Sequence, residues 1–130
     1  MCALVRWRVK RILDAGFVTY NLMDPVGERI SIVLVPGTDE IPVDLARLEA
    51  YIERSDCTVL NIQNYCRRLI PLARRHGKPI WCDVHDYNGH DPYYQDFVDA
   101  TDYLFMSSER MPTYRAFMQD RVSSGAELVI

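Results

Sequence analysis

Polar side chains that could bind a ligand stand at the ends of short apolar runs in the second half of the chain. Gln63 and Asn64 follow one such run, and Asp83 ends the next. Amide groups at a strand tip suit recognition of hydroxyl groups on a polar small molecule, but Asn64 is better interpreted as a cap for the following helix. A carboxylate at a strand tip either belongs to a ligand site or caps the loop that follows, and for Asp83 both alternatives are open.

The segment after Asp83 is the densest polar cluster in the sequence. It contains His85, Asp86, His90 and Asp91, whose nitrogen and oxygen atoms could ligate a metal ion. Their spacing matches no standard zinc or EF-hand pattern. The favoured interpretation is therefore a solvated turn in which asparagine, glycine and aspartate shape the backbone.

A third polar segment, residues 107–109, follows an apolar run that ends at Met106. The sequence has no Walker A or G-x-G-x-x-G pattern, and no motif places a Ser/His/Asp or Cys/His set. The residues by themselves predict a site for a small polar ligand at the edge of a sheet, and they assign no reaction to it.

Strands and helices that alternate from residue 42 onward must position these polar segments. Leu45, Leu48 and Ile52 recur at helical spacing, whereas residues 57–62 form the nearly continuous apolar run that is typical of a strand buried on both faces. Pro71 predicts a kink or a late start in the next helix. Alternating strands and helices indicate a parallel sheet, whose carboxyl ends lie at one edge. Further strands are expected at 79–84, 102–106 and 127–130, and helices at 65–76, 92–100 and 113–123.

The first third of the sequence has a different pattern. Residues 16–23 and 29–35 are rich in β-formers, and Asp-Pro-Val-Gly between them is turn chemistry, so we expect an antiparallel hairpin. Residues 3–13 fit either a strand or a helix, and both alternatives are open. The basic residues within 6–11 are interpreted as one solvated face.

The composition is that of a soluble globular domain. The chain has 130 residues, of which 48% are hydrophobic and 25% charged. A net charge of -3 gives no reason to expect nucleic acid as a partner, since phosphate binding requires a clustered basic surface. The sequence shows no signal peptide and no apolar stretch of ~20 residues, so we expect a cytoplasmic protein without a membrane segment.

Cys57 and Cys82 lie in apolar runs and are expected to be buried. A solvated helix face is expected for Arg67, Arg68, Arg74 and Arg75.

Four segments, taken in order, resemble those of PfkB/ribokinase-type carbohydrate kinases. The sequence DPVGER at 24–29 resembles the D-x-x-G-E-R turn of that family's lid hairpin. SDCTVLNIQ at 55–63 resembles the strand before its substrate loop, and ARRHGKPIWCDV at 73–84 resembles its G-K-P segment and the strand that ends in Asp. DYLFMSSE at 102–109 resembles the strand that leads into the family's N-x-x-E site. The resemblance covers roughly residues 16 to 130.

The resemblance implies a ribokinase-like α/β fold, with a parallel Rossmann-like sheet flanked by helices and a small antiparallel β lid hairpin. The chain would be a single partial kinase domain over residues 1–130, with the lid hairpin at about 16–36 and the α/β layer at about 42–130. The implied activity is transfer of the ATP γ-phosphoryl group, with Mg²⁺, to a sugar or sugar-like alcohol. The family's G-A-G-D segment and its Gly-Gly sugar motif have no match, and the chain ends inside its fourth expected strand. We therefore expect a truncated domain with no catalytic residue of its own and no activity alone.

A few site residues carry over from the family by position. Thr19 and Asn21 occupy lid-strand positions that can face substrate. Gln63 falls where a ribokinase-like member has a sugar-contacting acidic residue at the strand tip, and Asp83, also assigned to the substrate site, falls where members often have Asp or Asn. Ser108 and Glu109 lie where metal and phosphate are organised. Aligned on Ser108, the last position of N-x-x-E falls on Met111, whereas Glu109 is acidic but shifted.

The implied partner is a small sugar-like molecule, and the strand edges of the lid hairpin could also pair two copies of the chain into a homodimer. The alternative is a non-catalytic module of the same fold that binds a small ligand or dimerises. A different Rossmann-like enzyme with a metal ion in the 83–91 segment is the least favoured hypothesis.

Overall fold

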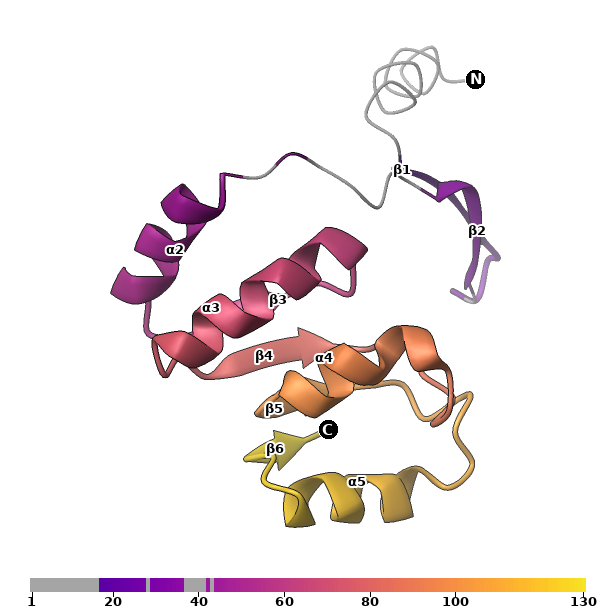
Figure 1. Cartoon of the computed structure of the whole chain (residues 1–130). Helices are drawn as coiled ribbons and strands as arrows, with labels where there is room; N and C mark the ends of the chain where they lie inside the picture. The colour runs from indigo at the N-terminus through magenta and orange to yellow at the C-terminus, as the bar shows by residue number, and fades with distance from the viewer. Residues whose placement is uncertain (1–16, 28, 37–41, 43) are drawn as a thin grey trace. The chain divides into compact units, whose positions relative to one another are not determined.

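The computed structural model describes residues 17–27, 29–36, 42 and 44–130, so the open choice for residues 3–13 lies outside the described residues. The chain divides into two compact units, Met1–Ile41 and Pro42–Ile130. Figure 1 labels the helices and strands of each unit.

The described part of the first unit is an antiparallel hairpin. Strand β1 (Phe17–Met23) pairs with β2 (Arg29–Pro36), which confirms the hairpin predicted from the sequence. The turn between the strands is closed by two bonds to Asp24: its carbonyl accepts the Gly27 N–H at 3.2 Å, and its Oδ1 accepts the Val26 N–H at 2.9 Å. Gly27 has a φ of 94°, a conformation that suits glycine.

One face of the hairpin is apolar. Tyr20 pairs with Ile32 and Leu22 pairs with Ile30, so these four side chains share a face. Each is between 41% and 67% exposed. A two-stranded hairpin is at best marginally stable by itself in water. Packing of another apolar surface against this face would therefore stabilise the hairpin.

The second unit contains a parallel sheet, as the sequence predicted. The strand order is β3-β4-β5-β6, and every neighbouring pair is parallel. The fold class is therefore α/β, with a four-stranded parallel sheet, helices and an antiparallel hairpin. The strands are β3 (Thr58–Leu60), β4 (Ile80–Asp83), β5 (Tyr103–Phe105) and β6 (Leu128–Val129). The helical segments are α2 (Leu45–Arg54), η1 (Asn64–Leu69), α3 (Ile70–Arg75), η2 (Pro92–Tyr94), α4 (Gln95–Ala100) and α5 (Tyr114–Ser123).

A capping aspartate and a proline set the starts of α2 and α3. Asp44 caps α2, because its Oδ1 accepts the Arg47 N–H at 3.0 Å. The segment after β3 starts as a 3₁₀ turn and becomes an α-helix only at Ile70, one residue before Pro71. Proline has no N–H to donate and is tolerated in a first helical turn, so the late helix start predicted from Pro71 is confirmed.

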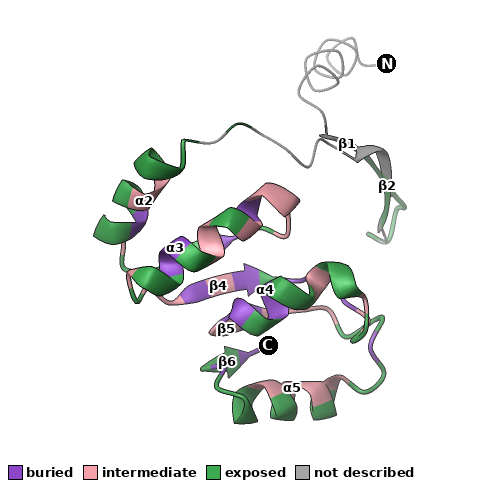
Figure 2. Cartoon of the chain, viewed as in Figure 1, coloured by how far each residue is buried: buried purple, intermediate pink, exposed green. Residues whose placement is uncertain are grey.

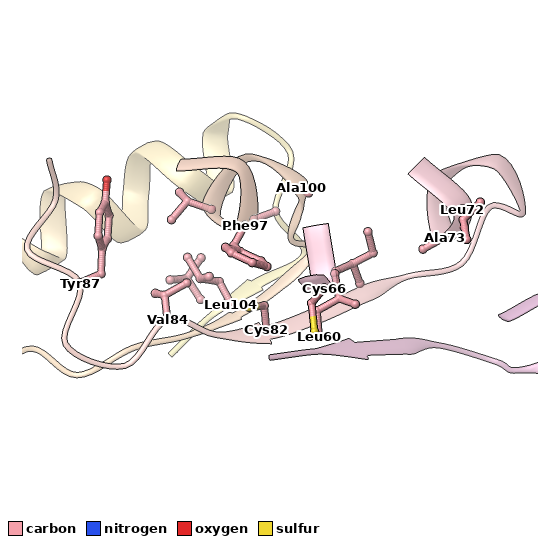
Figure 3. Packing of buried hydrophobic residues seen from close by; sticks show 14 of the residues in the cluster. Leu60, Cys66, Leu72, Ala73, Cys82, Val84, Tyr87, Phe97, Ala100 and Leu104 are labelled. Carbon is pink, nitrogen blue, oxygen red and sulfur yellow. The ribbon is translucent and has the colours of Figure 1, made fainter. Parts of the chain in front are cut away.

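The sheet has one well-buried face. Consecutive strands are neighbours in the sheet, so each crossover steps in the same direction, and right-handed crossovers then place every connecting helix on the same side. On that side Leu60, Cys82, Leu104 and Val129 form a row across all four strands, each at most 6% exposed. The core side chains rise from this face toward the helices (Figure 3). We call it the covered face.

The opposite face carries the alternate residues of the same strands. Val59, Trp81, Tyr103 and Leu128 form its central row, with Val59 75% exposed and Leu128 38% exposed. Figure 2 colours the chain by burial and shows β4 largely buried and β6 partly exposed. Trp81 stacks on Tyr103 with ring centroids 4.4 Å apart and on Phe105 at 5.8 Å. The prediction that residues 57–62 form a strand buried on both faces is therefore wrong, because only one face is packed against described helices. We call this second surface the open face.

Ion pairs link the helices to one another and to the sheet. Arg67 Nη1 lies 2.7 Å from Asp96 in α4, and Arg74 Nη1 lies 2.9 Å from Asp102, which precedes β5. The expected solvated face is therefore wrong at Arg67, whose side chain is only 21% exposed. It is confirmed at Arg68, Arg74 and Arg75, which are exposed. Cys57 is exposed, contrary to expectation, whereas Cys82 is buried as expected and its burial raises the pKa of the thiol to about 11. No helix in the described part of the chain is long and apolar enough to cross a membrane.

Candidate ligand site

The polar segments that follow β3, β4 and β5 lie at the carboxyl edge of one parallel sheet, as the sequence predicted. Backbone bonds tie the last two segments together. The Val84 N–H donates to the Phe105 carbonyl at 2.8 Å, and the Ser107 N–H donates to the His85 carbonyl at 2.7 Å. In open parallel sheets this edge is where ligands bind, so it is the candidate site.

Asp83 ends β4 and shapes the turn that follows. Its Oδ1 accepts the His85 N–H at 2.8 Å, which confirms the capping alternative. Its Oδ2 lies 3.5 Å from Nδ1 of the His85 ring, and both side chains are more than half exposed. One carboxylate oxygen thus remains turned toward a neighbouring imidazole and solvent, and a ligand role for Asp83 remains a prediction.

The rest of the 83–91 segment is partly anchored in the core. Tyr87 is 2% exposed, and its ring lies 5.3 Å from that of Tyr94 and 5.7 Å from that of Phe117. This burial raises the pKa of the Tyr87 hydroxyl. The interpretation as a purely solvated turn is therefore wrong at Tyr87. The expected shaping by asparagine is confirmed, because the Asn88 Oδ1 accepts the N–H groups of His90 and Asp91.

Two acidic side chains of this segment, Asp83 and Asp91, accept backbone hydrogen bonds. Asp91 Oδ1 accepts the Tyr93 N–H at 2.9 Å and so caps η2. Within the described ranges, no three His, Cys, Asp or Glu side chains gather closely enough to hold a metal ion. No reaction step is assigned to these residues.

The segment after β3 is held by a tyrosine and an arginine. Tyr93 Oη donates to the Ile62 carbonyl at 2.6 Å, and Arg67 Nε donates to Asn64 Oδ1 at 2.8 Å. Asn64 therefore holds Arg67 and does not cap the helix, which corrects the expectation. Gln63 occupies the cap position without a side-chain bond to the helix, so its amide is uncommitted to capping. Sequence reasoning missed Tyr93, which lies 31 residues from Ile62, and the pairing of Arg67 with Asp96, 29 residues away.

The segment after β5 does not reproduce a metal-binding pattern. Ser108 and Glu109 are exposed, and the Glu109 N–H lies 3.3 Å from Ser107 Oγ. Met111, at the last position of the aligned N-x-x-E pattern, is 1% exposed. It packs so near Gly89 that a Cβ there would lie 3.4 Å from the methionine Cε. A core side chain thus occupies the position where the family pattern has glutamate.

The two lid residues belong to the hairpin unit. Ser31 Oγ donates to Asn21 Oδ1 at 2.6 Å, across from the apolar hairpin face. Thr19 pairs with Val33 next to a register shift in the hairpin. The prediction that Thr19 and Asn21 contact the same ligand as Gln63 and Asp83 remains a prediction.

A separate hollow of about 380 Å³ lies between α3 and α4. It is open to solvent and lies among helix side chains, not at the strand tips, so the carboxyl edge remains the better candidate on chemical grounds. Its lining residues are Arg67, Ile70, Pro71, Asp96, Asp99 and Ala100.

Comparison with known proteins supports the fold and identifies no sequence family. No family model matches the chain, and no curated protein matches it in sequence. Among solved structures, it is similar to the microbiome-derived acarbose kinase Mak1, with a TM-score of 0.71 and 24% identity over 98% of this chain. It is also similar to Sa239, with a TM-score of 0.55 and 14% identity over 85% of this chain. The chain spans 47% and 41% of the length of these two structures, so its fold resembles part of each of them.

Proposed function

We propose that this chain is part of an ATP-dependent kinase of the PfkB/ribokinase type, which phosphorylates a hydroxyl group of a sugar or sugar-like alcohol. The observation that carries the proposal is the likeness in fold to a sugar kinase, Mak1, over 98% of the chain. The order of the four sequence segments that resemble PfkB-type kinases supports the same assignment.

The proposed substrate site lies at the carboxyl edge of the sheet. Gln63 and Asp83 would bind substrate hydroxyl groups, with Thr19 and Asn21 contributing from the lid hairpin. An amide and a carboxylate suit this task, because a hydroxyl group both donates and accepts hydrogen bonds. In such a kinase ATP would supply the phosphoryl group and Mg²⁺ would neutralise phosphate charge, with Ser108 and Glu109 in a minor role beside the phosphates. None of the described residues is proposed as catalytic.

The first test is a coupled ADP-release assay against a panel of sugars and nucleosides. It would be run on the chain and on the complete product of its gene. We expect sugar-dependent ADP release from the complete product and none from the chain alone, because no catalytic aspartate motif occurs in these 130 residues. A complete product that releases no ADP with any sugar or nucleoside would contradict the kinase proposal.

The second test measures sugar binding to the chain itself by isothermal titration calorimetry. Acarbose and maltose are the first ligands to use, because Mak1 is an acarbose kinase. An Asp83→Asn variant should bind more weakly than the native chain, whereas Asp86→Asn in the same segment is the matched control. Equal binding by both variants would remove Asp83 from the site.

A non-catalytic binding or dimerisation module is the alternative, and the hairpin favours it. The exposed apolar face of Tyr20, Leu22, Ile30 and Ile32 could pack against a second copy of itself. Light scattering should then give a dimer mass for the native chain and a monomer mass for Ile30→Glu, with Asp24→Asn in the turn as control. A monomeric native chain would rule out this mode of assembly.

A further inference from the structure

His85 has a backbone conformation that its side chain makes costly. Its φ is 49°, and it is the one residue other than glycine with a positive φ in the described part of the chain. In this left-handed region the Cβ crowds the following carbonyl oxygen, so glycine is preferred and other residues are uncommon, with asparagine, aspartate and histidine the more frequent exceptions. Strained backbone persists where the surrounding structure holds it, and it is concentrated at functional sites.

The turn around His85 is held from both sides. Its N–H donates to Asp83 Oδ1 at 2.8 Å, and its carbonyl accepts the Ser107 N–H at 2.7 Å. Val84 before it is fully buried, and Tyr87 after it is 2% exposed. His85 is therefore fixed to the carboxyl edge of the sheet between two anchored side chains.

More than half of the His85 imidazole is open to solvent. The His85 side chain is 56% exposed, and it lies outside the hydrophobic core cluster. Its close polar neighbour is the Asp83 carboxylate, which is 55% exposed. A glycine at this position would relieve the backbone strain, and little packing would be lost with a side chain that is 56% exposed.

The surroundings of the pair suit a cyclic sugar. A carboxylate and an imidazole side by side can together accept and donate hydrogen bonds to adjacent hydroxyl groups. Phe105 is the register partner of Asp83 on the next strand, and its ring stacks on Trp81 on the open face. Ligand sites commonly combine aromatic surface with a few polar groups, and a pyranose ring presents both hydroxyl edges and an apolar face.

We infer that His85 is a ligand-binding residue that, together with Asp83, holds adjacent hydroxyl groups of a cyclic sugar whose apolar face lies toward Phe105. This inference rests on the proposed function and adds to it a residue and a ligand class, since an open-chain polyol lacks the ring face.

The test uses the whole chain, with maltose and acarbose as cyclic probes and sorbitol as the open-chain probe. The variants His85→Gly and His85→Asn both tolerate the left-handed backbone, and His90→Asn is the matched control in the same segment. Calorimetry gives affinities and thermal unfolding gives the melting temperature. Nitrogen-15 NMR follows the ring nitrogens of the three histidines, with His76 and His90 as internal references.

We expect both His85 variants to lose roughly tenfold or more in affinity for a cyclic probe, because hydrogen bonds to charged or polar partners in a site are worth about that much. The melting temperature of His85→Gly should be unchanged or higher, and the ring signals of His85 alone should shift on sugar addition. Sorbitol should bind at least tenfold more weakly than the cyclic probes.

Three results would overturn the inference, and they separate it from the proposed function. Native affinity in both His85 variants removes His85 from the site and leaves the proposed function intact. A lower melting temperature together with weaker binding in both variants assigns His85 a structural role. A native chain that binds neither maltose nor acarbose removes the sugar site at this edge, and the inference falls with it.

Discussion

The two faces of the parallel sheet are built from the same strands and have opposite surroundings. On the covered face, Leu104 and Cys82 in the middle of the sheet are each 1% exposed. On the open face, Val59 is 75% exposed, although it is as apolar as its neighbours. The difference arises from connectivity, because four strands laid down in sequence order by right-handed crossovers receive helices on one side. Strand composition therefore does not by itself determine which face a helix covers.

The largest expected effect comes from one substitution on each face, which tests whether the two faces differ in packing. Leu104→Ala should lower the free energy of unfolding by about 2–5 kcal/mol, because it leaves a cavity among packed side chains. Val59→Thr on the open face should change it by no more than about 0.5 kcal/mol. Urea denaturation followed by circular dichroism measures both. Similar losses for the two variants would mean that the open face is packed in solution.

A second substitution tests how the helix layer is fixed to the sheet. Asp102 Oδ2 accepts the Ile80 N–H at 2.8 Å, and the same carboxylate pairs with Arg74. Asp102→Ala should cost about 1–3 kcal/mol, because it leaves a buried backbone donor without a partner. Asp96→Ala removes a carboxylate that is 68% exposed, so its cost should stay within about 1 kcal/mol. Equal losses of unfolding free energy for the two variants in urea denaturation would show that the hydrogen bond to Ile80 contributes no more than the exposed ion pair.

The smallest expected effect concerns the contact between α2 and α3. A hydrogen bond with His76, assisted by the Arg75 charge, lowers the pKa of Glu49 below 4.5. An acid whose pKa is lower in the folded state stabilises the fold above its unfolded pKa and loses that contribution as the pH falls through the folded value. Stability should therefore decline below about pH 4.5, and Glu49→Gln should make this decline shallower. Unfolding curves between pH 3 and 7 measure it, with Glu53→Gln as control. An unchanged slope would exclude Glu49 as a source of the decline.

The sequence predicted the elements well and their surroundings poorly. The helical spacing of Leu45, Leu48 and Ile52 and the apolar runs between helices were enough to predict the parallel sheet and its carboxyl edge, because both patterns are local. The exposure of Val59 could not be predicted, since an apolar run does not record which face lacks a helix. The partners of Arg67 and Arg74 lie 29 and 28 residues away, a distance at which charge pattern carries no pairing information.

The candidate site divides in the same way. The positions of Asp83 at the end of β4 and of Gln63 shortly after β3 followed from periodicity. The Asn-Gly turn chemistry predicted the backbone shape near Asn88. The burial of Tyr87 was missed, because a single aromatic residue in a polar segment has no periodic neighbours. The strain at His85 was also missed, because backbone dihedrals of a residue other than glycine leave no mark in a single sequence.

The stack of Trp81 on Tyr103 and Phe105 has a practical consequence. The chain contains two tryptophans, Trp7 and Trp81, so Trp7→Phe would leave a single indole emitter on the open face. Its emission would respond to any molecule or chain that settled there and displaced water from the ring. Trp81 fluorescence would therefore report binding at the open face, two residues before Asp83 on the same strand.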